Sequence, residues 1–118
     1  EKAIVSPYSQ IGEGTCVMAG AVVTPNAIIG TNSVINTGAI IEHDCFVGDN
    51  TFISTGAILA GEVKINNNCF IGLGSKVLEG ITIGNNVTIG AGAVVINDIP
   101  NNSTAVGVPA KIIKMKES

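Results

Sequence analysis

Aliphatic residues recur along the chain at every sixth position. Stepping by six from Val5 to Val95 meets an isoleucine, valine or leucine at each of sixteen positions. An α-helix repeats every 3.6 residues and a plain strand every two, so neither can hold this register. A fixed period over most of a chain is typical of repeat architectures. The pattern predicts a stack of short strands over residues 5–99, each contributing one aliphatic side chain to a shared interior.

A second period, of eighteen residues, groups these hexapeptides in threes. Two columns contain only glycine and asparagine, which best tolerate a positive φ. Their members are Gly20, Gly38, Gly56, Gly74 and Gly92, and Gly14, Asn32, Asn50, Asn68 and Asn86. The third column is looser, with Asn26, Asp44, Glu62, Gly80 and Asp98. We predict a triangular prism of about five coils, with left-handed backbone at two of its three corners.

Composition narrows the fold and excludes several functions. Isoleucine and valine together outnumber leucine by 31 to 3 and aromatic residues are scarce, which favours an all-β fold with a narrow core. A net charge of -3 and the lack of arginine argue against nucleic acid as a partner. No apolar run approaches the roughly 18 residues of a membrane-spanning helix. We therefore expect a soluble, cytoplasmic protein that does not bind membranes.

The three cysteines do not suggest a reactive site. Cys16, Cys45 and Cys69 fit neither a paired disulfide framework nor a CxxC motif. We expect them to be buried small hydrophobic residues in a reducing compartment.

The candidate chemistry depends on His43, the single histidine. It falls in the loosest corner column, with Pro25 one coil before it and Gly61 one coil after, so we expect an exposed ring at an edge of the prism. Glu42 and Asp44 flank it and could orient the ring. Gly61, about one strand spacing away, offers an unobstructed backbone N–H of the kind that stabilises an oxyanion in acyl transfer. The alternative is that both are ordinary turn residues.

The repeat of an aliphatic residue, a glycine or acidic residue, two variable residues and a small one resembles the hexapeptide-repeat acyltransferases. The GVPAK segment of residues 107–111 resembles the closing motif of many of them. The resemblance implies a left-handed parallel β-helix, although right-handed crossovers are the general rule. The stretches NTGAIIEHDC, GAILAGEVKI, CFIGLGS and IGAGAVV look like the branch of sialic acid and sugar-nucleotide O- or N-acetyltransferases. That branch transfers acetyl from acetyl-CoA to a sugar amine or hydroxyl, in surface glycan or polysaccharide biosynthesis, and the resemblance implies no metal.

The resemblance also implies roles for single positions. His43 would be the general base, and Asp44 the acidic partner that raises its basicity. Asn36 matches a family asparagine close to the site, and Glu42 is a second candidate for the sugar. The residues expected at the acetyl-CoA groove are Gly61, Leu73, Ala91 and Lys111, the last near the CoA phosphates.

The chain departs from its relatives in two places. Many relatives carry a second histidine nine residues after the first, in contact with the acetyl group, where this chain has Phe52. Relatives also have an N-terminal domain that holds the sugar nucleotide, which we expect this chain to lack. We divide the chain into the β-helix of residues 5–99 and a C-terminal tail of residues 100–118. A non-catalytic β-helix scaffold or binding module that has lost activity is the alternative interpretation.

Several outward-facing strand positions are apolar. They are Val22, Ile28, Val34, Ile40, Phe46, Phe52, Ile58 and Phe70. A free monomer rarely leaves so much contiguous apolar surface in water. The resemblance implies a homotrimer of parallel prisms. Because His43 and the face that carries Asn36 diverge within one chain, we expect the sites to form between subunits.

Overall fold

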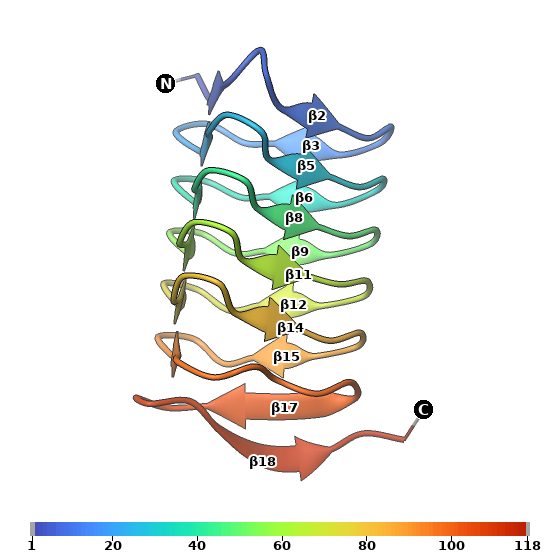
Figure 1. Cartoon of the computed structure of the whole chain (residues 1–118), viewed down its shortest axis with the longest axis vertical. Coiled ribbons are helices and arrows are strands. Elements are labelled where there is room, and N and C mark those ends of the chain that lie inside the picture. The colour runs from blue at the N-terminus through green and yellow to red at the C-terminus, as the bar shows by residue number, and fades with distance from the viewer. Residues whose placement is uncertain (1, 118) are drawn as a thin grey trace.

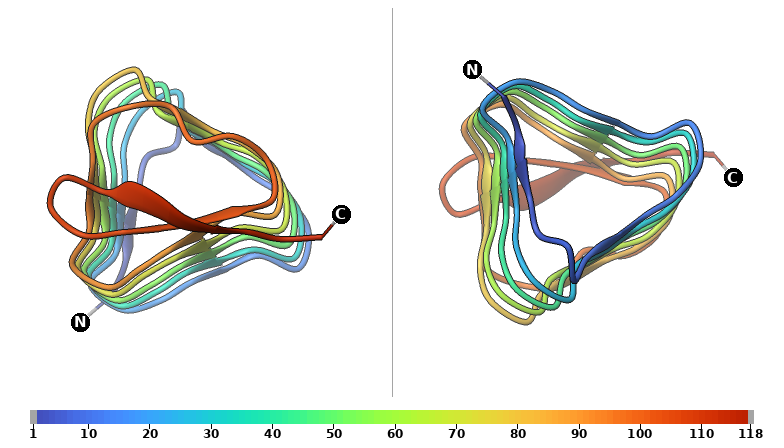
Figure 2. Two further views of the ribbon diagram at one scale, coloured as in Figure 1. Left: turned by 90° about the horizontal axis from the view of Figure 1, so that it is seen from below. Right: turned by 90° about the horizontal axis from the view of Figure 1, so that it is seen from above.

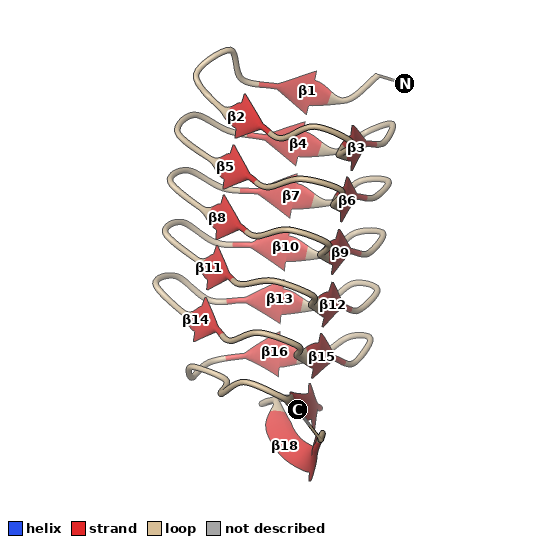
Figure 3. Ribbon diagram, turned by 90° about the vertical axis from the view of Figure 1, so that its right-hand side faces the viewer, coloured by secondary structure: helices blue, strands red, loops and turns tan. Residues whose placement is uncertain are grey.

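The computed structural model describes residues 2–117 and shows parallel strands wound into a three-sided solenoid (Figures 1 and 3). Sheet A contains β1 (Ile4–Val5), β4 (Val22–Val23), β7 (Ile40–Ile41), β10 (Ile58–Leu59), β13 (Lys76–Val77) and β16 (Val94–Val95). Sheet B contains β2 (Gln10–Ile11), β5 (Ile28–Ile29), β8 (Phe46–Val47), β11 (Lys64–Ile65) and β14 (Thr82–Ile83). Sheet C contains β3 (Cys16–Val17), β6 (Val34–Ile35), β9 (Phe52–Ile53), β12 (Phe70–Ile71), β15 (Thr88–Ile89), β17 (Ser103–Val106) and β18 (Lys111–Met115).

The strands stack in the register that the eighteen-residue period predicts. In sheet A, for example, Ile40 pairs in parallel with Ile58, and Ile58 with Lys76. Viewed from the N-terminal end, the chain runs anticlockwise as it recedes, so the coils are left-handed (Figure 2). The predicted β-helix is confirmed. Sheet A has six strands, so the stack holds about six coils rather than five.

The three edges of the prism are named after the sheets they join. The A/B edge follows sheet A and includes His43 and Asp44. The B/C edge includes Asp49 and Asn50, and the C/A edge includes Leu73 and Gly74. In Figure 3 the A/B turns lie on the left and the C/A turns on the right.

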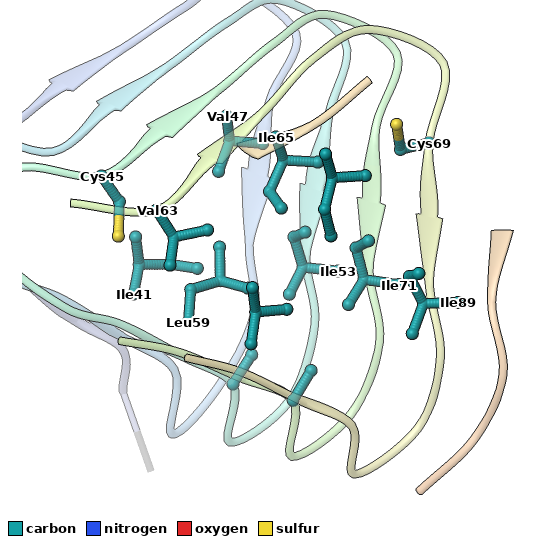
Figure 4. Close-up of a cluster of buried hydrophobic side chains, with 14 of the residues drawn as sticks. Ile41, Cys45, Val47, Ile53, Leu59, Val63, Ile65, Cys69, Ile71 and Ile89 are labelled. Atoms are coloured by element: carbon teal, nitrogen blue, oxygen red, sulfur yellow. The ribbon is translucent and has the colours of Figure 1, made fainter. Parts of the chain in front are cut away.

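The interior is a column of the aliphatic side chains that the six-residue register predicts (Figure 4). Ile53, Leu59, Ile65 and Ile71 have no exposed surface. Small residues such as Ala57 fill the space near the corners. Because these side chains pack in a close column, truncating one of them to alanine would cost about 2–5 kcal/mol of stability.

All three edges turn through left-handed backbone. The predicted glycine and asparagine columns have positive φ, but so do Asn26 (67°), Asp44 (61°), Glu62 (61°) and Gly80 (76°) of the A/B edge. The two predicted left-handed corners are confirmed, and the A/B corner, which was not predicted, is left-handed as well. Stacked coils must share one turn geometry to keep their backbone hydrogen bonds. The stack thus imposes a conformation that aspartate and glutamate rarely adopt alone.

The stack continues into the segment that we expected to be a tail. β17 pairs in parallel with β15, with Thr88 opposite Thr104, an offset of sixteen residues rather than eighteen. β18 then returns antiparallel to β17 and crosses the C-terminal end of the prism (Figure 2). Among residues 2–117 there is no helix long and apolar enough to span a membrane.

The cysteines only partly follow the prediction. Cys45 and Cys69 are buried, as expected, and burial raises the pKa of the Cys45 thiol to about 11. Cys16 is exposed, and the prediction was wrong there, because it takes the outward-facing position of β3.

Candidate active site

His43 lies on the A/B edge, where the chain turns from β7 to β8. The turn hydrogen bonds of its neighbours hold it in place: Asp44 N–H donates to Pro25 O (3.2 Å), and Glu62 N–H donates to His43 O (2.9 Å). The side chain of His43 is 54% exposed. The prediction of an exposed ring at an edge of the prism is confirmed.

Asp44 is the carboxylate that orients the imidazole. Its Oδ2 lies 3.0 Å from His43 Nδ1. An ionised carboxylate only accepts hydrogen bonds, so Nδ1 carries the proton and Nε2 is the basic nitrogen of the neutral ring. The same hydrogen bond is the main reason why the pKa of His43 lies above its usual 6.5. Glu42 makes no such contact: its N–H donates to Leu59 O, and it contributes nothing to the pKa shift.

Gly61 lies directly against the other side of the ring. A Cβ built on Gly61 would fall 2.5 Å from His43 Nε2. Within residues 2–117, the backbone N–H of Gly61 donates no hydrogen bond. A residue with a basic nitrogen and a residue with an unused amide donor are therefore neighbours on two successive coils, and an acyl transfer requires both groups.

Sequence reasoning missed two carboxylates that influence His43. Glu62 and Glu79 both raise its pKa through their charge, in addition to Asp44. The eighteen-residue period places Glu62 one coil after Asp44 and Glu79 one coil after Gly61, so the register contained the signal. With Asp44, these two carboxylates give the A/B edge a negative charge around the His43 imidazole.

The structure places the other predicted site residues elsewhere. Asn36 follows β6 on sheet C, where its Oδ1 accepts a hydrogen bond from Thr37 N–H (2.7 Å). Leu73 and Ala91 lie exposed on the C/A edge, one coil apart. Lys111 begins β18 and is also exposed. One chain therefore brings together only His43, Asp44 and Gly61, with Glu42 next to them in sequence.

Phe52 and its surroundings also lie on sheet C. Its ring stacks on Phe70 of the next coil, with the centroids 5.3 Å apart and the planes 5° from parallel. Phe70 is 46% exposed. The residue that stands where relatives have a second histidine is therefore part of an aromatic pair on a face that does not contain His43.

Within residues 2–117, the imidazole belongs to no cluster of metal-ligating side chains and has no cysteine thiol directed at it. Across the described residues, no three His, Cys, Asp or Glu side chains come close enough to hold a metal ion. Cys45 is near in sequence, but its Sγ donates to Ala60 O (3.0 Å). The surface of residues 2–117 also contains no pocket, so a single chain does not enclose a small substrate.

Two family models match the chain. A model described as bacterial transferase hexapeptide (six repeats) matches residues 8–43, and one described as hexapeptide repeat of succinyl-transferase matches residues 62–96. The chain belongs to the hexapeptide-repeat superfamily. A comparison with curated proteins finds no match.

Solved members of the hexapeptide-repeat superfamily share the whole fold of this chain. PerB from Caulobacter crescentus, in complex with CoA and GDP-perosamine, is 42% identical with a TM-score of 0.94, over 96% of this chain and 55% of that one. The acetyltransferase domain of PglB from Neisseria gonorrhoeae, in complex with acetyl coenzyme A, is 42% identical with a TM-score of 0.93, over 95% and 55% of the two chains. WeeI from Acinetobacter baumannii is 28% identical with a TM-score of 0.70, over 94% and 57%. This chain spans about half the length of these relatives.

Proposed function

We propose that the chain is the catalytic part of an acetyltransferase that moves the acetyl group of acetyl-CoA to the amine of a nucleotide-linked amino sugar. The single observation that carries the proposal is the position of the His43 ring against Gly61 on the next coil, together with the absence of a hydrogen-bond partner for the Gly61 N–H among residues 2–117. The bound CoA, acetyl-CoA and GDP-perosamine of the similar proteins support the choice of donor and acceptor.

In the proposed reaction the acceptor amine attacks the carbonyl carbon of the thioester directly. His43 Nε2 removes a proton from the attacking nitrogen, while Asp44 holds Nδ1 and stabilises the imidazolium that results. Gly61 N–H donates to the developing oxyanion, the C–S bond breaks, and the sulfur of CoA leaves and takes up a proton. Cys45, the cysteine nearest to His43 in sequence, is protonated and its Sγ donates to Ala60 O, so it does not act as a nucleophile. The transfer therefore proceeds without a covalent enzyme intermediate.

We further propose that the active protein is a homotrimer with its sites between subunits. Two observations support this. The predicted site residues lie on different edges and faces of one chain, and no pocket encloses any of them. Many outward positions of the strands are apolar, with Ile28, Phe46 and Phe70 each more than a third exposed. A second subunit would cover this surface and bring a C/A edge and sheet C close to His43.

A cytoplasmic location fits this proposal, because acetyl-CoA and nucleotide sugars are cytoplasmic metabolites. Three free cysteines are consistent with a reducing compartment.

The experiment that tests the function is a panel of nucleotide-linked amino sugars and sialic acids, incubated with acetyl-CoA and assayed by release of the CoA thiol. We expect turnover with amino sugars, and a rise in melting temperature on adding acetyl-CoA alone. Turnover only with sialic acids would place the chain in the O-acetylating branch. No turnover and no thermal shift would favour the non-catalytic scaffold.

The trimer is tested by Ile40→Lys, which puts a charge in the middle of the apolar face of sheet A. We expect a monomer by light scattering and loss of turnover, because a desolvated lysine is costly at an interface. Gln10→Lys is the matched control, since Gln10 is an exposed polar residue at the outward position of sheet B. An active monomeric Ile40→Lys would refute the shared site.

A further inference from the structure

Gly61 occupies a hexapeptide position at which side chains are otherwise the rule. Stepping by six from Pro7 to Asn97 meets sixteen residues at this position, and Gly61 is the only glycine among them. The backbone does not require glycine there, because Gly61 is not among the residues with positive φ. Ala91, at the same position of a later hexapeptide, shows that the turn accepts a Cβ. The glycine therefore needs an explanation other than turn geometry.

The space that a side chain would fill at this position is occupied by the His43 ring. A Cβ on Gly61 would lie 2.5 Å from Nε2, 2.6 Å from Cε1 and 3.2 Å from Cδ2 of His43. Contacts below 3.0 Å are essentially never made by a real Cβ, so the ring would have to move. All three atoms belong to the imidazole. A side chain at Gly61 would therefore clash with the His43 ring and not with neighbouring backbone atoms.

We propose that Gly61 is a positioning residue whose missing side chain forms a seat for the His43 imidazole. The seat leaves room for Nε2 where a Cβ of residue 61 would otherwise lie, while Asp44 Oδ2 lies 3.0 Å from Nδ1. Two contacts on opposite sides thus fix the plane and the direction of an otherwise exposed ring. This role is separate from that of the Gly61 N–H, which any residue except proline would supply. The inference rests on the proposed function of His43 as the base.

The structure also indicates how a side chain at Gly61 would be accommodated. The imidazole is 54% exposed, so it can swing into solvent without disturbing the core. The swing would carry Nδ1 away from Asp44 and Nε2 away from the Gly61 amide. A substitution at this position should therefore displace the base and leave the fold intact.

Gly61→Ala is the decisive variant, because it keeps the N–H and adds only the Cβ. We expect kcat to fall about 10- to 100-fold, the loss typical of a misplaced catalytic group. The melting temperature should stay within about 2 °C of the parent, because the added Cβ meets only the exposed His43 ring, which can move into solvent. Combining Gly61→Ala with His43→Ala should reduce kcat no further than His43→Ala alone, because the two changes act through one ring.

The single histidine also allows the seat to be measured without turnover. An NMR titration of the imidazole follows His43 alone, and in the parent its pKa lies above 6.5 because of the Asp44 hydrogen bond, with smaller contributions from Glu62 and Glu79. In Gly61→Ala we expect the titration midpoint to move down towards 6.5, because the displaced ring loses Asp44. The Nδ1 proton signal of the neutral ring should weaken in the same variant.

Two results would overturn the inference. One is an unchanged titration in Gly61→Ala, whatever its activity, since the ring would then not have moved. The other is a further loss of kcat when Gly61→Ala is added to His43→Ala, which would assign the effect to the backbone donor. Full activity of His43→Ala would instead refute the proposed base, and the NMR titration would still decide whether the seat exists.

Discussion

The B/C edge and the A/B edge of the prism use the same left-handed turn but treat its outward N–H groups differently. On the B/C edge, from Thr31 onwards, an asparagine or aspartate from the next coil accepts a hydrogen bond from each of these N–H groups. Thr31 N–H donates to Asp49 Oδ1 (2.8 Å), Asp49 N–H to Asn67 Oδ1 (2.8 Å), and Asn67 N–H to Asn85 Oδ1 (2.9 Å). The last step, from Asn85 N–H to Asn101 Oδ1, measures 2.7 Å.

The A/B edge has no such ladder at the corresponding positions. Gly61 offers no side chain to the turn of His43, and the Gly61 N–H donates to nothing within the described residues. Where the B/C edge has a ladder of side-chain amides, the A/B edge has the His43 ring packed against Gly61. A regular solenoid can therefore form a candidate active site where an edge has a backbone N–H without a partner next to an exposed basic side chain.

On the inner side of the B/C edge, side chains also form a ladder of hydrogen bonds between successive coils. Ser33 Oγ donates to Gly48 O (2.8 Å) and accepts from Thr51 N–H (3.0 Å), and Thr51 Oγ1 donates to Asn66 O (2.9 Å). Cys69 continues this inner ladder, with its Sγ 3.0 Å from Gly84 O. The A/B edge has a matching inner bond from Cys45 Sγ to Ala60 O (3.0 Å), so the two edges differ on the outer side, where the side chains of His43 and Asp44 contact each other and form no ladder with the next coil.

The largest effect that separates the two edges should come from His43→Ala. We expect turnover to fall about 10²- to 10⁴-fold, the usual contribution of a general base, while acetyl-CoA still raises the melting temperature. The free energy of unfolding should hardly change, because the ring is mostly in water. Steady-state kinetics and thermal denaturation check both parts. Retention of full activity would remove His43 from the mechanism.

Asp44→Asn should have a smaller and pH-dependent effect. The asparagine keeps the size of the side chain but cannot act as a charged acceptor for Nδ1–H, so we expect a loss of about tenfold in maximal rate. The base works only when neutral, so the rate rises with pH through the pKa of His43. Losing Asp44 lowers that raised pKa, and the acid limb of the rate profile should move to lower pH. A limb that stays in place would show that Asp44 does not tune the ring.

The smallest effect is expected from the matched change on the closed edge, Asn67→Ala. It removes the acceptor for Asp49 N–H at an exposed site, which should cost about 1 kcal/mol, or a few degrees in melting temperature. Activity per folded molecule should not change. Asn67 and His43 share one hexapeptide position, so the two variants should show opposite patterns of stability and activity. Loss of activity without loss of stability in Asn67→Ala would contradict the assignment of the B/C edge to stability and the A/B edge to catalysis.

Much of the fold could be predicted because the repeat is one-dimensional. Each coil contacts only its neighbours, so the periods of six and eighteen define both the buried rungs and the strand pairing. The same register was sufficient to place Gly61 on His43 and Glu62 next to Asp44. It was not sufficient for the last coil, where the offset between β15 and β17 falls to sixteen residues.

The candidate site could be predicted only in part. The sequence pointed to His43 with Glu42 and Asp44 on either side, and only the family resemblance singled out Asp44 as its partner; in the structure Asp44 makes the contact with the ring. At Asp44 the left-handed backbone directs the carboxylate towards Nδ1. Glu42 instead continues the backbone hydrogen bonding of sheet A, with its N–H donating to Leu59 O. Asn36, Leu73, Ala91 and Lys111 stay predictions, because one chain does not bring them to the imidazole.

By itself, the sequence determined the β-helix, its narrow aliphatic core and the edge on which the only histidine is displayed. These follow from spacing alone, since residues six apart take equivalent positions on successive faces and residues eighteen apart stack when every coil repeats the last. Three features came from the tertiary structure: the A/B corner is also left-handed, Asp44 Oδ2 lies 3.0 Å from Nδ1 of His43, and the ring fills the space above Gly61. Those features depend on how neighbouring coils constrain each other's backbone, and the chemistry of single residues does not contain that constraint.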